Sequence, residues 1–125
     1  MDEYSPFRWF LWCAQRSAKT REIEFLLDLP YLKELWERQG GICPYTGIKM
    51  KVSPNTKNRI FSPDWASLDR IDSDKGYIKG NVQFVCMFIN FGKNKFSDKT
   101  VKQFIQDIRE PKAVDAEKKQ SIVIP

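Results

Sequence analysis

Three residues with oxygen-bearing side chains, Asp69, Asn81 and Asn90, could take part in one divalent metal site. Carboxylate and amide oxygens are hard ligands, which suit Mg²⁺ or Mn²⁺ better than zinc. Such an ion can stabilise the charge that develops when a phosphodiester bond is broken. Each residue alone is more typical of a structural role, with Asp69 capping a turn and the asparagines satisfying nearby backbone groups. Only the combination of the three residues favours a catalytic metal site over these structural roles.

The surrounding pattern predicts the elements that would bring these residues together. Residues 65–71 have the character of a short strand, residues 73–76 of a turn, and a second extended run begins at Tyr77 and is interrupted by Lys79-Gly80. From Val85 the spacing becomes helical, with one apolar face and one polar face: Phe84, Phe88 and Phe91 on the first, Asn90, Lys93 and Asn94 on the second. If this helix packs on the hairpin, Asn90 approaches Asp69.

The segments Ser67-Leu-Asp-Arg-Ile-Asp72, Lys75-Gly-Tyr77 and Gly80-Asn-Val-Gln83 resemble the His-Asn-His (HNH) endonucleases of the ββα-metal fold, in a phage and bacterial subgroup. The resemblance covers about residues 29 to 109. It implies an α+β fold, in which a ββα-metal hairpin and helix are flanked by N-terminal and C-terminal helices. Matched position by position, it implies that Asp69 and Asn90 bind the metal and that Asn81 is the central asparagine, orienting the loop or the scissile group.

The chain departs from this family at the reaction centre. Arg70 stands where the family has its general-base histidine, and the chain contains no histidine. A guanidinium stays protonated, so Arg70 cannot accept a proton from water. It can instead hold a phosphate oxygen in the transition state. Three alternatives remain for the base: Asp72, Tyr77, or water activated by the divalent ion. Asp72 could equally be a salt-bridge partner of Arg70.

The resemblance therefore implies a metal-dependent HNH-type endonuclease, a hydrolase that cleaves DNA, with double-stranded DNA as its partner and one Mg²⁺ or Mn²⁺ as its cofactor. Loss of the histidine leaves an alternative open, a non-catalytic nucleic-acid-binding domain on the same fold. A protein-interaction module is a third alternative.

The net charge of +5, from 21 basic and 16 acidic residues, is compatible with a nucleic-acid partner. Five basic residues in and near the hairpin are predicted to contact phosphates without reading sequence: Lys75, Lys79, Lys93, Lys95 and Arg59. A scattered, solvated basic surface is the alternative interpretation.

The cysteines predict no structural zinc. Cys43 and Cys86 stand at half of the positions of a double Cys-x-x-Cys knuckle, while Thr46 and Ile89 occupy the partner positions. Two thiols without histidine cannot complete a four-coordinate zinc site. We expect both cysteines to pack as small buried groups. With Cys13 the count is odd, which fits a reducing cytoplasm better than a disulfide framework.

Length and pattern predict one domain over residues 1–109, with a metal-site core at 65–96 and N-terminal helical support at 5–39. Helices are expected at 6–18, with Ser5 as cap, at 29–39 after Asp28, and after Ser97. A polar tail, 110–125, ends in Ile122-Val-Ile124, which could form an edge strand or contact a partner. No signal peptide or membrane-spanning run is visible, so we expect the protein to be located in the cytoplasm, or in the host-cell cytoplasm if it is encoded by a phage. A homodimer or larger assembly stays open.

Overall fold

The computed structural model describes residues 3–52 and 62–111. The fold is α+β, which confirms the predicted class. Its elements are, in chain order, α1 (Ser5–Arg21), β1 (Phe25–Leu26), α2 (Leu29–Gln39), β2 (Ala66–Arg70), β3 (Tyr77–Ile78), β4 (Val82–Cys86), α3 (Met87–Lys93) and α4 (Asp98–Arg109). Within these described ranges, no helix is both long and apolar enough to cross a lipid bilayer.

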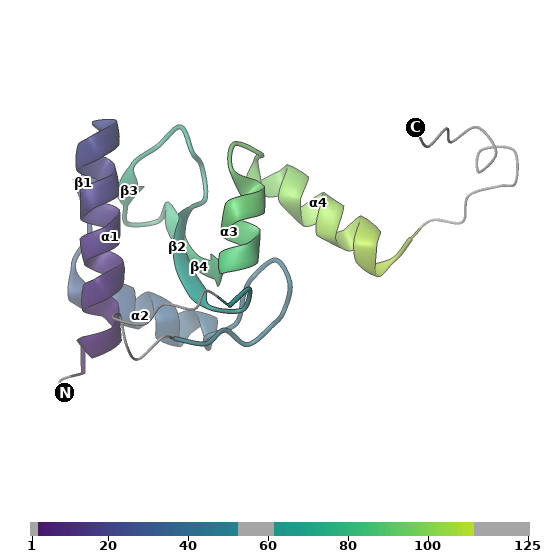
Figure 1. Cartoon of the computed structure of the whole chain (residues 1–125), viewed down its shortest axis with the longest axis horizontal. Coiled ribbons are helices and arrows are strands. Elements are labelled where there is room, and N and C mark those ends of the chain that lie inside the picture. Colours follow the sequence, from purple (N-terminus) through teal and green to yellow (C-terminus); the bar gives the residue numbers. More distant parts are fainter. Residues whose placement is uncertain (1–2, 53–61, 112–125) are drawn as a thin grey trace, which may run out of the picture.

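The centre of the molecule is the antiparallel pair β2–β4, which continues without a loop into α3. The register places Asp69 of β2 opposite Gln83 of β4. In Figure 1 this pair lies between α1 and α3, and α3 contacts both strands. Two strands and one helix therefore have the expected ββα arrangement.

The second extended run is divided at Lys79-Gly80, as predicted, but its first part does not belong to the hairpin. Only β4 pairs with β2, while β3 pairs in parallel with β1, Phe25 opposite Tyr77. The division occurs at Gly80, whose φ of +87° turns the chain in a conformation that L side chains rarely adopt. Gly76 lets β3 approach β1, because a Cβ at this position would lie 2.4 Å from the carbonyl oxygen of Glu24.

The helix α3 packs on the strand pair through its polar stripe, as its pattern predicted. Phe84 belongs to β4 and is fully buried, whereas Phe88 and Phe91 are 70% and 71% exposed. The predicted polar face is the inner one, where Lys93 is 3% exposed and bonded to β2. The two phenylalanines are outside because α3 is held on the strands by the ion pair of Lys93 and by the buried side chain of Ile89.

The N-terminal helices pack on the other side of the strand pair. Phe84 of β4 lies in an aromatic cluster with Phe7, Phe10 and Trp36, at ring-centroid distances of 6.2, 5.1 and 5.3 Å. The side chain of Gln39 both donates to the carbonyl of Phe84 and accepts from its amide, at 2.9 and 2.8 Å. Gln39 thus satisfies the free backbone edge of β4 and ties α2 to the site.

The helix caps confirm two of three predictions. The side chain of Asp28 accepts from the amide of Tyr31 at the start of α2, and that of Ser97 accepts from the amide of Thr100 at the start of α4. Ser5 is not a cap, because α1 already includes it, and Tyr4 occupies the N-cap position without a side-chain cap hydrogen bond. The proline at the start of α1 fixes a helical φ there, so a side-chain cap is dispensable.

Candidate active site

A buried ion pair joins the end of β2 to α3. The Nζ of Lys93 donates to Oδ2 of Asp69 at 2.7 Å, and their side chains are 2% and 10% exposed. The same ammonium donates to the carbonyls of Arg70 and Ile71, at 2.7 and 3.1 Å. Three oxygen acceptors around one ammonium satisfy all its donors, which makes burial of this charge tolerable.

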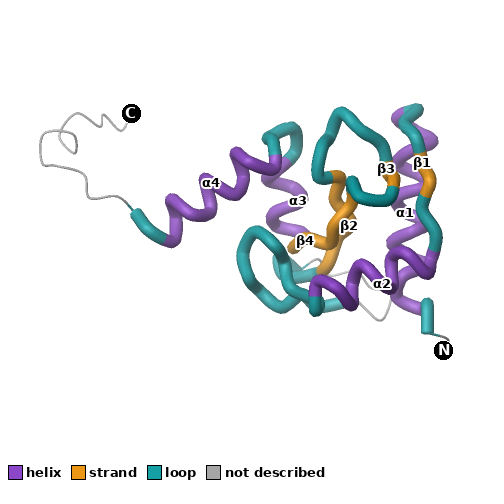
Figure 2. The backbone as a smooth tube through the Cα atoms, turned by 180° about the vertical axis from the view of Figure 1, so that it is seen from behind, coloured by secondary structure: helices purple, strands orange, loops and turns teal. Residues whose placement is uncertain are grey.

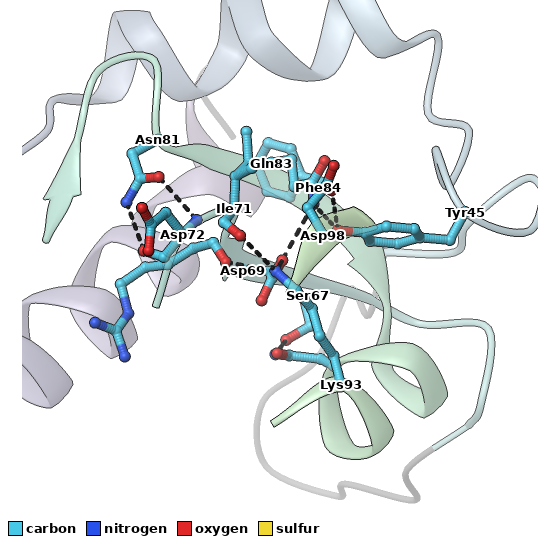
Figure 3. Close-up of polar contacts among 12 residues, drawn as sticks. Tyr45, Ser67, Asp69, Ile71, Asp72, Asn81, Gln83, Phe84, Lys93 and Asp98 are labelled. Atoms are coloured by element: carbon cyan, nitrogen blue, oxygen red, sulfur yellow. Dashed lines mark hydrogen bonds and ion pairs between the residues drawn. The ribbon is translucent and has the colours of Figure 1, made fainter. Parts of the chain in front are cut away.

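This ion pair belongs to a longer chain of hydrogen bonds, drawn in Figure 3. Gln83 donates through Nε2 to Oδ2 of Asp69 at 3.1 Å and to the hydroxyl of Tyr45 at 2.8 Å. Tyr45 in turn donates to Oδ1 of Asp98, at the start of α4. The network therefore fixes Asp69 from β4 and α3, and connects it to α4.

The two ends of this network have shifted pKa values. Burial, together with the acceptor carboxylate of Asp98, raises the pKa of Tyr45. Burial alone would also raise the pKa of Asp98, but hydrogen bonds from Tyr45 and Lys102 outweigh it and lower that pKa. Near neutral pH the pair is therefore a neutral phenol that donates to a carboxylate.

Asn90 lies over the same face of β2 as Asp69. Its Nδ2 donates to Oγ of Ser67 at 2.5 Å. Ser67 and Asp69 are two positions apart on one strand, so their side chains leave the same face. With Nδ2 directed at Ser67, the amide oxygen Oδ1 is the atom that a divalent ion would use. Asn90 and Asp69 thus come from α3 and β2 to one place, as predicted.

Asn81 holds the loop between β2 and β4. Its Oδ1 accepts from the amide of Asp72 at 2.9 Å, and its Nδ2 donates to the carbonyls of Asp72 and Gly76, at 3.1 and 2.9 Å. Asn81 is buried. Of the two roles that the sequence left open, the structure shows the first, orientation of the loop.

Arg70 is held at the end of β2 by the same loop. Its Nη1 donates to the carbonyls of Ser73 and Lys75, at 2.8 and 2.9 Å, and its guanidinium lies 5.5 Å from the centroid of the Tyr77 ring. Tyr77 is buried, and its hydroxyl donates to Oγ of Ser17 at 3.4 Å. These hydrogen bonds hold the Arg70 guanidinium in one orientation, and the ring of Tyr77 packs against it.

The structure brings many of the predicted residues into one pocket. The pocket has a volume of about 840 Å³ and lies between α1, β2 and α3. Four predicted site residues line it together with one predicted phosphate contact: Asp69, Arg70, Tyr77, Asn90 and Lys95. The pocket is also lined by Trp9 and Arg21 of α1 and by Asp74 of the loop, which the sequence pattern did not place at this site. Nothing in their spacing linked α1 to the hairpin.

Several predicted residues lie elsewhere. Asp72 is not among the residues that line the pocket, because β2 ends at Arg70 and Oδ1 of Asp72 accepts from the amide of Asp74 in a turn. Lys93 cannot contact phosphate as predicted, since it is buried in the ion pair. Lys75 and Lys79 are exposed but outside this pocket. Arg59 lies outside the described residues.

The two cysteines near the site are buried, as expected. Cys43 is fully buried and Cys86 is 2% exposed, and Sγ of Cys43 accepts from the amide of Cys86 at 3.5 Å. Burial raises the pKa of Cys86 to about 11. The knuckle turn persists, with Gly47 at a φ of +75° and its amide bonded to the carbonyl of Cys43.

Among the described residues, no group of three or more His, Cys, Asp or Glu side chains could hold a metal ion. An ion at Asp69 would have Asn90 as its second ligand. Hard ions such as Mg²⁺ commonly take one or two protein ligands and complete their shell with water and substrate phosphate. Both side-chain contacts of Asp69 fall on Oδ2, which leaves Oδ1 unused by either. The donor set fits one hard divalent ion, although the charge of Lys93 opposes it.

The chain is similar in sequence to a phage protein. A protein of Enterobacteria phage T4, named as an uncharacterized 29.0 kDa protein in the dda-modA intergenic region, is 36% identical over 92 residues. The match covers 74% of this chain and 32% of the phage protein, so the chain spans about a third of its relative. Neither a family model nor a solved structure matches the chain significantly.

Proposed function

We propose that this domain is a metal-dependent endonuclease that hydrolyses DNA phosphodiester bonds. The observation that carries the proposal is the convergence of Asp69 and Asn90 from two elements on one polar pocket. The ββα arrangement and the loop fixed by Asn81 support it. The phage relative is compatible with a nuclease but its name states no activity.

Asp69 and Asn90 would hold one Mg²⁺ or Mn²⁺, and this ion would supply positive charge to the scissile phosphate. Around it, the chain provides cations that can bind the DNA backbone. Arg70 lines the pocket in a fixed orientation, while Arg21 and Lys95 lie at the same pocket from α1 and from the segment after α3. These three residues would neutralise and position the phosphates.

The pocket also limits the choice of proton acceptor. Asp72 lies outside it, and the hydroxyl of Tyr77 already donates to Ser17. Asp74 is exposed and lines the pocket, so it replaces Asp72 as the carboxylate that could accept a proton from water. Substitution of Asp74 by Asn then reduces cleavage and leaves DNA binding intact.

A second function is favoured by one specific observation, the neutralisation of Asp69 by Lys93. An ammonium 2.7 Å from the carboxylate competes with any second cation. If that competition prevails, the same cations of the pocket would still bind phosphates, and the domain would be a nucleic-acid-binding module without cleavage.

One experiment separates these functions. The purified chain is incubated with supercoiled plasmid in Mg²⁺, Mn²⁺ or chelator, beside Asn90→Ala and Asn90→Asp. Asn90 is partly exposed, so both variants should fold. The nuclease predicts nicking that requires the ion, is lost in Asn90→Ala and is kept in Asn90→Asp, which retains an oxygen ligand. Salt-sensitive DNA binding without nicking supports the binding module. If the chain neither nicks nor binds DNA, the nuclease and the binding module are both refuted.

A further inference from the structure

The outer side of α3 and α4 carries an exposed apolar surface. Its five large side chains are 57–71% exposed: Phe88, Phe91, Phe96, Phe104 and Ile108. We call these five residues the α3–α4 face. Figures 1 and 2 show α4 extending away from the strand pair, with α3 between them. Contiguous apolar surfaces of this kind on soluble domains generally mark an interaction site.

The α3–α4 face contains a groove as well as protruding side chains. The groove has a volume of about 300 Å³ and an almost wholly apolar lining, to which Phe88, Phe96, Phe104 and Ile108 contribute. Gly92 of α3 also lines it, and a Cβ at this glycine would meet no atom within 4 Å. The missing side chain thus leaves open space beside the exposed phenylalanines.

The helix α4 has little support in this chain. Val101 is buried and Ile105 packs against the core, but Phe104 and Ile108 on the same stripe are 63% and 57% exposed. A helix of 12 residues is marginal in water without a packed face. Two pairs of its polar side chains already bond each other, Asp98 with Lys102 and Gln103 with Asp107. The apolar stripe is therefore the part of α4 that needs a partner.

We propose that the α3–α4 face binds a second copy of this chain in a two-fold symmetric dimer. A two-fold interface brings the same surface of both copies together, so that surface must offer both a protrusion and a recess. Phe104 and the space over Gly92 provide them on one face. The polar pairs of α4 then form the rim of the interface.

The area of the face agrees with a dimer. A phenylalanine side chain can bury about 150–250 Å², so four of them at the observed exposures, with Ile108, offer roughly 500–700 Å² per copy. Two such faces bury more than the ~1,000 Å² in total that a specific interface requires. Because each copy has a net charge of +5, salt should strengthen this association, whereas it weakens DNA binding.

The test is the mass of the full chain in solution, measured by sedimentation velocity at micromolar concentrations with chelator and without DNA. The wild type should sediment as a dimer that tightens with salt. Phe104→Asp should be monomeric, while Leu26→Asp should remain dimeric. Leu26 of β1 is a matched control because it is also 63% exposed but lies outside the face.

Gly92→Leu provides a second variant that should not harm the monomer. Leucine favours a helix over glycine, and the site has open space in one copy. The melting temperature of monomeric Gly92→Leu should equal or exceed that of the monomeric wild type. The affinity of Gly92→Leu for a second copy should fall at least tenfold.

A monomeric wild type at all concentrations tested overturns the proposal. So does a dimer that persists in both Phe104→Asp and Gly92→Leu. The proposal is independent of the nuclease function, since the mass is measured without metal or DNA.

Discussion

Replacement of Lys93 by methionine should destabilise the protein strongly. Methionine keeps the length of the side chain but leaves Oδ2 of Asp69 with Gln83 alone, and removes the donor to two backbone carbonyls. Breaking a buried pair by removing one partner costs about 3–5 kcal/mol. This is a large part of the ~5–15 kcal/mol by which a domain of this kind is stable.

The chain contains a matched control for this substitution. Lys102 pairs with Asp98 at 3.0 Å, close to the 2.7 Å of Lys93 and Asp69, but the Lys102 side chain is 59% exposed. Exposed pairs of this type contribute about 0–1 kcal/mol. Lys102→Met should therefore change the free energy of unfolding by less than ~1 kcal/mol.

Urea unfolding at pH 7, followed by circular dichroism, measures both variants. The double variant Asp69→Leu/Lys93→Met removes both charges together and should recover part of the loss, because no unpaired charge then stays buried. If Lys93→Met costs no more than Lys102→Met, the ion pair does not hold α3 on β2 and our account of the site is wrong.

Three other predictions concern the loop, the strand approach and pH. Asn81→Ala, which removes three hydrogen bonds, should cost about 2–4 kcal/mol in urea unfolding, and a loss below ~1 kcal/mol would contradict its role in the loop. Gly76→Ala should lower the melting temperature because its Cβ meets the Glu24 carbonyl, whereas Gly92→Ala, with open space, should not lower it. Since hydrogen bonds outweigh burial and lower the folded-state pKa of Asp98, its contribution to stability should be lost as pH falls below about 4. Asp98→Asn should flatten this part of a plot of melting temperature against pH, and an unchanged slope would refute the assignment.

Local patterns in the sequence predicted much of the fold. The caps of α2 and α4 were predictable because Asp28 and Ser97 each accept from the backbone amide three residues further along the chain. The ββα core was predictable from alternation followed by helical spacing. Pairing of β3 with β1 was not, because it depends on the close approach of Gly76 to Glu24, far apart in the chain.

The orientation of α3 depends on charge pairing as well as on periodicity. A helical pattern separates apolar from polar residues, and the apolar side is normally the buried one. Here one ion pair to Asp69 fixes the polar side inward, so Phe88 and Phe91 point outward. The same ion pair shows that Lys93 is an internal cation and not the phosphate contact that the sequence predicted. The burial of Lys93 could not be predicted, because charge pairing across the fold is invisible in a single sequence.

The internal cation also explains how this site can be organised without a metal. Several carboxylates gathered around an ion repel one another when the ion leaves, so such sites depend on the ion for their structure. Here one carboxylate is balanced by Lys93, and neutral side chains, Gln83 and Asn90, complete the surroundings. The geometry of Asp69 is thus set by the protein itself. In the function that we propose, a metal would then be needed for cleavage and not for folding, and loss of cleavage would leave the pocket and its cations in place.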